Sequence, residues 1–307
     1  MKFFDFVKNL FILLIFVQVA PALFSNIRKQ YNKYVSPQTQ VGIIKFSSAI
    51  YDSAPYNKQL HDLFTNNDIK AILLEFECPG SAAGSGQIIH NELQQLKKQY
   101  RKPVIALVEN ICASGGYYIA SAADHIIAPG CSIIGSIGVT LPYFLQFKDF
   151  GEQFKIHHIP MKSGTYKDAT NPLVNITDAD KAMLQNVLDD SHQQFIADVA
   201  HNRALSPATA AQWGDGQLFS GRQALKLGLI DEIGSAHNAI AIIKKKAIIE
   251  GEIEWVKQAP KSGLAALFGD SDSQDDQTLF HALINKIRML CTSLFHEIAI
   301  TNRSYIA

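Results

Sequence analysis

The sequence predicts an α/β fold with a largely parallel sheet, on two observations. Three apolar runs have the length of strands and are apolar enough to be buried on both faces, as in parallel sheets. Between them lie two amphipathic segments of helical period, and in the second of these Ile89, Leu93 and Leu96 share a face. This alternation repeats a β-α-β unit. The strand runs are 41–46, 71–77 and 103–110, and the helical segments lie around 58–65 and 86–100.

The chain has no formal net charge, because it contains 28 Lys and Arg residues and 28 Asp and Glu residues. This balance, without a basic stripe, offers no electrostatic case for binding nucleic acid. The four cysteines include no C-x-x-C pair and no cysteine and histidine spacing typical of zinc ligands. We therefore expect neither a metal site nor a bound cofactor, and we expect the cysteines to be small buried apolar side chains.

An apolar segment near the N-terminus, 10–24, is typical of membrane targeting, because Lys2 and Lys8 precede it and Arg28 follows it. The run is shorter than the ~20 residues that span a bilayer comfortably, but the apolar residues before Lys8 can extend it. We expect an uncleaved anchor. The alternative is a signal peptide removed at the small residues of 20–22, and a buried core helix is the weaker interpretation. Both targeting outcomes place the rest of the chain outside the cytoplasm of a bacterium-like cell.

The chain is expected to have three parts: an anchor and linker over 1–38, a folded domain over 39–260, and a tail over 261–307. Within the tail, an acidic linker at 269–277 precedes an amphipathic helix at 279–300. This helix can dock on a neighbouring subunit, lie on the membrane or cover the mouth of a site. The sequence leaves these three roles open.

A long helix is expected to begin at Thr177, because Thr177 and Asp180 have the spacing of a capping box. An apolar stripe follows it at helical spacing, and core packing or subunit packing explains that stripe better than a cofactor. The stripe consists of Met183, Leu184, Val187, Leu188, Phe195, Ile196 and Val199.

Two loops follow the carboxyl ends of predicted neighbouring strands, one at 78–86 and one at 111–116, and they should lie side by side. Each joins a strand end to a helix start, where unpaired backbone N–H groups can stabilise a developing oxyanion. Ser114 lies in the second loop. It is either a nucleophile at the helix start or a small residue at a tight turn, and the elbow pattern G-x-S-x-G is not matched.

Five ordered blocks of the sequence together resemble the signal peptide peptidase A or protease IV family, the membrane-bound serine proteases of the S49 type. ASGGYYIASAADHIIA and the following GSIGV resemble the region of the family's serine nucleophile. The resemblance covers about 40–258 and is closest to the short members with a single repeat. It implies a crotonase-like or ClpP-like α/β fold. The other three blocks are CPGSAAGSGQII, KSGTYKDATNP and FSGRQALKLGLIDEIGS, the last of which resembles a turn and short helix leading to a Gly-Leu-Ile-Asp strand.

The resemblance implies a role for each of five residues. Ser114 matches the nucleophile, and Lys167, 53 positions later, matches the general base. Ser136 matches a residue whose hydroxyl holds the lysine amine, and the backbone N–H groups of Gly80 and Gly115 match the oxyanion hole. Because a free lysine has a pKa near ~10.4, the base would have to be desolvated beside the serine to reach ~7 to 8.

Two departures from the family pattern affect the expected site. The family's Ser-Pro-Gly-Gly is replaced by CPGS at 78–81, so Ser81 stands where a second glycine is usual. If that position requires a positive φ, Ser81 would strain the oxyanion loop by about 1 to 2 kcal/mol. Ile134 replaces a frequent threonine and is expected to change only the wall near Ser136.

Other nucleophiles and bases fit the sequence less well. His125 follows Ser114 by 11 residues, and a helix leading away from the serine would carry it some 15 Å along the axis at ~1.5 Å per residue. His157 and His158 fall in a predicted strand, where adjacent side chains point to opposite faces. Cys112 has no paired base and is expected to be a buried thiol.

The sequence and the resemblance together predict a membrane-anchored serine endopeptidase with a Ser/Lys dyad. The resemblance implies cleaved signal peptides or other membrane-associated peptides as substrates, and a homo-oligomer in which neighbouring protomers share sites. The expected location is the bacterial inner membrane, with a single span and the catalytic domain outside the cytoplasm. The alternative is a catalytically impaired, assembly or chaperone-like membrane protein of the same fold. An acyl-CoA enzyme is weaker, because no carboxylate pair is evident.

Overall fold

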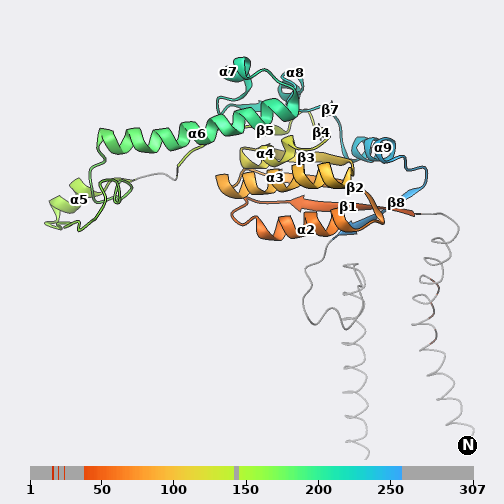
Figure 1. Cartoon of the computed structure of the whole chain (residues 1–307), viewed down its shortest axis with the longest axis horizontal. Coiled ribbons are helices and arrows are strands. Elements are labelled where there is room, and N and C mark those ends of the chain that lie inside the picture. The colour runs from red at the N-terminus through yellow and green to blue at the C-terminus, as the bar shows by residue number, and fades with distance from the viewer. Residues whose placement is uncertain (1–15, 17–19, 21–23, 25–37, 142–144, 258–307) are drawn as a thin grey trace, which may run out of the picture. The chain divides into compact units, whose positions relative to one another are not determined.

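The computed structural model describes residues 38–141 and 145–257, together with Phe16, Ala20 and Phe24. Its strands are β1 (Gln38–Phe46), β2 (Ile69–Cys78), β3 (Val104–Ala113), β4 (His125–Ala128), β5 (Ile133–Gly135), β6 (Leu218–Ser220), β7 (Glu232–Ile233) and β8 (Glu252–Lys257). Its helices are α2 (Ala54–Thr65), α3 (Ala83–Tyr100), α4 (Gly115–Ser121), α5 (Lys148–Gln153), α6 (Asp178–Arg203), a 3₁₀ turn at Pro207–Thr209, α7 (Ala210–Trp213), α8 (Gly221–Lys226) and α9 (Ala236–Ala247). The labels are those of Figure 1.

The sheet is parallel except where β5 meets β6, and its main path runs in the order β6-β5-β3-β2-β1-β8. The third strand has two partners on the same edge. Its first half pairs with β4, through Ile105 and His125, and its second half pairs with β5, through Ala113 and Gly135. The end of β3 therefore lies beside β5, where the sheet turns away from β4.

Alternation of apolar side chains along the strands fills two cores, one on each face of the sheet. Ile72, Leu74 and Phe76 of β2 pack with α2, α3, α4 and α6 on one face. On the other face Ala71 and Leu73 pack with α9. Burial on both faces explains why the three predicted strand runs are nearly continuous in apolar residues.

The expected strands and helices are confirmed with shifted ends. Strand β3 continues through Ala113, so the expected loop at 111–116 is reduced to the junction at Ser114. The segment after α8 was expected to enter a strand at Gly228, but Gly228 adopts a positive φ of +75° in a turn, and the strand that follows is Glu232–Ile233. A positive φ is incompatible with a continuous strand, which explains the displacement.

Helix α6 begins as predicted, with a capping box between Thr177 and Asp180. Its 26 residues correspond to about 39 Å at ~1.5 Å per residue. The stripe of apolar residues is buried only towards the C-terminal end, at Phe195 and Val199, whereas Val187 is 55% exposed. The stripe thus packs on the sheet domain over its second half and leaves the first half uncovered within the described part of the chain.

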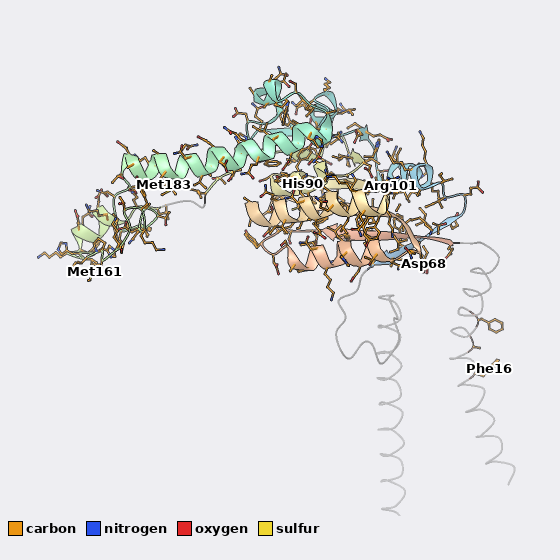
Figure 2. All side chains as sticks on the ribbon, viewed as in Figure 1. Phe16, Asp68, His90, Arg101, Met161 and Met183 are labelled. Atoms are coloured by element: carbon orange, nitrogen blue, oxygen red, sulfur yellow. The ribbon has the colours of Figure 1, made fainter. Side chains whose placement is uncertain are left out.

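The segment 145–177 before α6 forms a small lobe, which we call the lysine lobe. Apart from those of Thr177, which caps α6, its described hydrogen bonds join it to itself, as when the backbone N–H of Phe147 donates to the carbonyl of Pro172 at 2.7 Å. Nine of its large apolar side chains are exposed, including Met161 at 94% (Figure 2). The others are Leu145, Phe147, Phe150, Phe154, Ile156, Ile159, Tyr166 and Leu173.

The expected anchor at 10–24, apart from three helical residues, and the expected tail helix at 279–300 lie outside the described residues. The ends of the expected domain, 39–260, are likewise described only as far as Lys257. Among the described residues, no helix combines the length and the apolar character that crossing a bilayer requires.

Candidate active site

Ser114 is the single residue between the end of β3 and the start of α4. Its backbone has φ +52° and ψ −128°, which residues other than glycine rarely adopt and which costs about 1 to 3 kcal/mol. Two hydrogen bonds hold this conformation: the Ser114 N–H donates to Gly135 at 2.7 Å, and the Ser114 carbonyl accepts from Tyr118 at 2.9 Å. A half-exposed serine on a strained strand-to-helix turn has the geometry of a nucleophile elbow, although the sequence lacks the full glycine pattern.

The loop after β2 faces Ser114, as predicted from the strand order. A Cβ added at Gly80 would lie 3.3 Å from the Ser114 Cβ and 3.5 Å from its Oγ, so the Ser114 side chain lies close beside Gly80. The loop is fixed by a short bridge to Ile50, whose N–H donates to the Gly80 carbonyl at 3.0 Å and whose carbonyl accepts from Ala82 at 2.8 Å.

The backbone N–H groups of Gly80 and Gly115 flank the serine, and neither has a hydrogen-bond acceptor among the described residues. For Gly115 this follows from its place as the first residue of α4, where no preceding turn supplies a carbonyl. Unpaired N–H groups on both sides of a nucleophile can receive the negative oxygen of a tetrahedral intermediate.

Ser136 lies next to Ser114 because the parallel register continues past Ala113 and Gly135. It too has a positive φ, +50°, and its N–H donates to the carbonyl of Gln217 at 2.7 Å. The following carbonyl, that of Ile137, accepts from His192 Nε2 at 3.1 Å. Because His192 belongs to α6, this hydrogen bond ties the helix to the segment that carries Ser136. No motif or spacing in the sequence indicates this contact.

Lys167 lies in the lysine lobe, and its side chain is exposed. Its neighbour Lys162 forms an ion pair with Asp168, whereas Lys167 has no ion pair or side-chain hydrogen bond among the described residues. No described hydrogen bond joins Lys167 to Ser114. The expected burial of this lysine beside the serine is therefore not found within a single chain.

The structure removes one expected source of strain in the oxyanion loop. Ser81 is absent from the described residues with a positive φ, which include Ser114 and Ser136. A serine at this position therefore needs no left-handed backbone, and the predicted cost of 1 to 2 kcal/mol does not arise. The neighbouring Ile134 is fully buried on β5.

Two buried thiols support the site without competing with Ser114. Cys78 and Cys112 occupy paired positions of β2 and β3, and burial raises the pKa of both thiols. A raised pKa disfavours the thiolate, which is the reactive form. Cys78 instead donates a hydrogen bond to the Gly80 carbonyl at 3.2 Å.

Comparison with known proteins shows which family this chain belongs to. The sequence model of peptidase family S49 matches residues 96–250, about half of the chain. The chain belongs to peptidase family S49. Ser114, Ser136 and Lys167 of this S49 protein all fall inside the matched region, and Gly80 precedes it.

Three relatives of this S49 chain illustrate the similarity. A candidate protease of Methanocaldococcus jannaschii is 32% identical over 196 residues, which are 64% of this chain and 62% of that protein. A candidate protease of Synechocystis is 37% identical over 172 residues, 55% of this chain and 60% of that protein. A candidate signal peptide peptidase of Enterococcus faecium is 29% identical over 201 residues, 66% of this chain and 58% of that protein. The matches span about three fifths of these relatives.

None of the histidines considered as bases forms a described hydrogen bond with Ser114. His125 pairs with Ile105 on β3, nine positions before Ser114, which corresponds to roughly 30 Å along a strand. Its side chain contacts Glu232 at 3.3 Å. The predicted strand around His157 and His158 is wrong: this segment is irregular and exposed, and His158 contacts Asn171 at 3.1 Å. Strand pairing requires a partner, and the described lysine lobe contains no strand.

A polar network holds α6 against α3 and α4, the helix that follows Ser114. Tyr118 of α4 donates to Asp198 of α6, and its ring stacks on Phe195 at 4.4 Å. His90 of α3 lies against the Tyr118 ring at 4.7 Å and receives a hydrogen bond from Asn202 of α6 at 2.7 Å. Burial and the Asp198 hydrogen bond raise the pKa of Tyr118, so its hydroxyl remains a donor. Single sequences carry no pattern for such long-range pairs.

Proposed function

We propose that this S49 protein is a membrane-anchored serine endopeptidase in which Ser114 is the nucleophile and Lys167 the general base. The observation that carries the proposal is the backbone of Ser114, held at a positive φ between two N–H groups that have no acceptor among the described residues. Strain of this kind persists only where the surrounding structure enforces it, and it concentrates at reactive sites. The mostly parallel sheet and its helix-covered faces support a crotonase-like or ClpP-like fold.

In the proposed reaction, the Ser114 Oγ attacks the carbonyl carbon of a peptide bond while the neutral Lys167 amine takes the hydroxyl proton. The resulting oxyanion is stabilised by the N–H groups of Gly80 and Gly115. When the tetrahedral intermediate collapses, the lysine ammonium returns its proton to the leaving amine. Water then attacks the acyl-enzyme, again with Lys167 as base, and Ser114 is regenerated. The Ser136 hydroxyl orients the lysine amine.

The lysine is proposed to come from a second copy of the chain. In a single chain Lys167 is exposed and makes no contact with Ser114, yet its lobe carries nine exposed apolar side chains. Exposed apolar surface of this extent marks an interaction site. Packing of the lysine lobe against a neighbouring sheet domain would bury these side chains and desolvate Lys167, which lowers the pKa of a lysine.

Substrates and location are part of the same proposal. A relative in Enterococcus faecium is named as a signal peptide peptidase, which supports cleaved signal peptides or other membrane-associated peptides as substrates. The apolar segment at 10–24 supports a single-span anchor in the bacterial inner membrane, with the catalytic domain outside the cytoplasm.

A second candidate function follows from one observation, the separation of Ser114 and Lys167 in the single chain. If no assembly brings the lysine to the serine, the protein would bind peptides or assemble at the membrane without cleaving them. The same surfaces would then serve binding, since a strained serine loop by itself does not establish hydrolysis.

Three forms of the full-length protein in detergent distinguish the candidates: the natural chain, Ser114→Ala and Lys167→Ala. The measurement is hydrolysis of an apolar peptide ester, together with mass spectrometry of acyl-enzyme trapped on Ser114. We expect turnover and acylation only in the natural chain. Equal turnover in all three forms would exclude the dyad, and no turnover in a folded, oligomeric natural chain would support the binding function.

A further inference from the structure

Ser81 occupies a confined position between the starts of two helices. A Cβ added at Gly115, the first residue of α4, would overlap the Ser81 Oγ and lie 2.7 Å from the Ser81 Cβ. A Cβ added at Gly86, in the first turn of α3, would also overlap the Ser81 Oγ. The Ser81 side chain therefore fills the space that two neighbouring glycines leave open.

This contact is directly coupled to the nucleophile. Gly115 follows Ser114 in the chain, and Gly80 precedes Ser81, so the Ser81 side chain packs where the two backbone segments that supply the flanking N–H groups meet. Both glycines in contact with Ser81 are buried, and protein interiors do not leave such gaps unfilled. A side chain of the wrong size would shift one segment relative to the other.

We propose that Ser81 is a positioning residue of the oxyanion hole, a spacer that sets the distance between Gly80 and the start of α4. This inference rests on the proposed function, because it assumes that Ser114 forms a tetrahedral intermediate. Ser81 acts through the two glycines and does not touch substrate. The serine that replaces the expected glycine at this position therefore has a function in the site.

The size of the side chain at position 81 can be exchanged with that at position 86. Ser81→Gly empties the space, and Gly86→Ala overfills it. In the double variant the new methyl group would lie 2.4 Å from the former position of the Ser81 Oγ and fill part of its space, with the Gly115 Cα at 3.5 Å as its nearest remaining neighbour. Gly84→Ala is the matched control on the same helix, since a Cβ there meets nothing within 4 Å.

The experiment measures kcat, KM and the inhibition constant of a peptide aldehyde, whose serine adduct places an oxyanion in the hole, for the full-length chain and these variants. We expect each single variant at 81 and 86 to lower kcat about 10-fold with little change in KM, because small displacements of catalytic groups reduce rates strongly. Aldehyde affinity should fall by the same factor. The double variant should recover most of both losses, and Gly84→Ala should match the natural chain.

Unchanged kcat and aldehyde affinity in Ser81→Gly, or losses that merely multiply in the double variant, would overturn the spacer. A change confined to KM would also overturn it, because an oxyanion defect acts on the transition state. Failure of the proposed function is separately visible: the natural chain would then show no turnover that depends on Ser114. If a single variant fails to fold, recovery in the double variant still decides the question.

Discussion

The two residues of the proposed catalytic pair lie in different surroundings: Ser114 is held within the sheet domain, whereas Lys167 is exposed in the lysine lobe. Ser114 lies at the end of a buried strand, and its backbone is fixed by a hydrogen bond that it donates to Gly135 and one that it accepts from Tyr118. Lys167 lies in a lobe with nine exposed large apolar side chains, whose described hydrogen bonds are internal apart from the Thr177 cap of α6. One chain completes the surroundings of the proposed nucleophile, whereas the proposed base would require a further surface.

This difference shows which information each half needs. A strand pairing and a helix start are specified within one domain, so the serine geometry forms wherever the sheet forms. Desolvation of a lysine requires a neighbouring surface that covers it. Assembly would then control activity directly, because an isolated chain would carry a charged, solvated lysine.

Mixing two inactive variants tests most directly whether the serine and the lysine of one site come from different chains. Ser114→Ala and Lys167→Ala alone should each lose at least about 1,000-fold in turnover, as expected when one member of a catalytic unit is removed. When equal amounts are co-expressed and assembled, about a quarter of the sites in a closed ring pair an intact serine with an intact lysine of the next copy. Turnover of the mixed assembly should recover to about that fraction, measured with the same peptide ester. No recovery would place both residues in one chain.

Removal of one aromatic ring from each region should separate stability from assembly. Phe76→Ala removes a fully buried ring from β2 and should lower the free energy of unfolding by about 3 to 5 kcal/mol. Phe150→Ala removes a ring that is 61% exposed in the lysine lobe and should change it by less than about 0.5 kcal/mol. Chemical denaturation followed by the fluorescence of buried Trp213 measures both.

The same Phe150→Ala variant should lower turnover and the assembled fraction in size-exclusion chromatography. The reason is that the exposed ring belongs to the surface that we propose a neighbour covers. Loss of stability without loss of assembly would contradict the assignment of this lobe as an interaction surface.

A smaller, pH-dependent effect tests how α6 is held on the sheet domain. Burial lowers the pKa of His90, and its ring accepts a hydrogen bond from Asn202 only when neutral. Asp198 opposes this shift and Lys97 reinforces it. Because the unfolded histidine protonates near ~6.5, stability should be full above that pH and decrease as the pH falls below it.

His90→Gln is the matched variant, since an amide oxygen can accept from Asn202 at every pH. Its stability should be less sensitive to pH between about 6.5 and 5 than that of the natural chain, measured by thermal unfolding across this range. If the stability of both proteins depended on pH in the same way, protonation of His90 would not weaken the packing of α6 on α3.

The sheet domain was largely predictable, because its pattern is local. The runs at 41–46 and 71–77 lie within β1 and β2, and Ser114 lies opposite Gly80 as the strand order required. The resemblance added Ser136, whose place beside Ser114 follows from the β3 and β5 register. Short-range periodicity and strand order are properties of the sequence alone.

What escaped prediction depends on distant contacts or on backbone conformation. The strand expected around His157 failed, because apolar alternation does not supply a pairing partner. The contact of Ser81 with Gly115 and Gly86 joins residues up to 34 positions apart, and no spacing rule indicates it. The hydrogen bond from His192 to Ile137 is of the same kind.

Helix α6 connects its buried C-terminal half to the lysine lobe over a long distance. About 17 residues, or ~25 Å, separate its first turn from the buried Phe195. Without a break in the helix, a tilt of about 10° at the buried end would displace the first turn by about 4 Å, more than the length of a hydrogen bond. A small change in packing near Tyr118 and Asp198 would thereby produce a larger displacement at the lobe that carries Lys167.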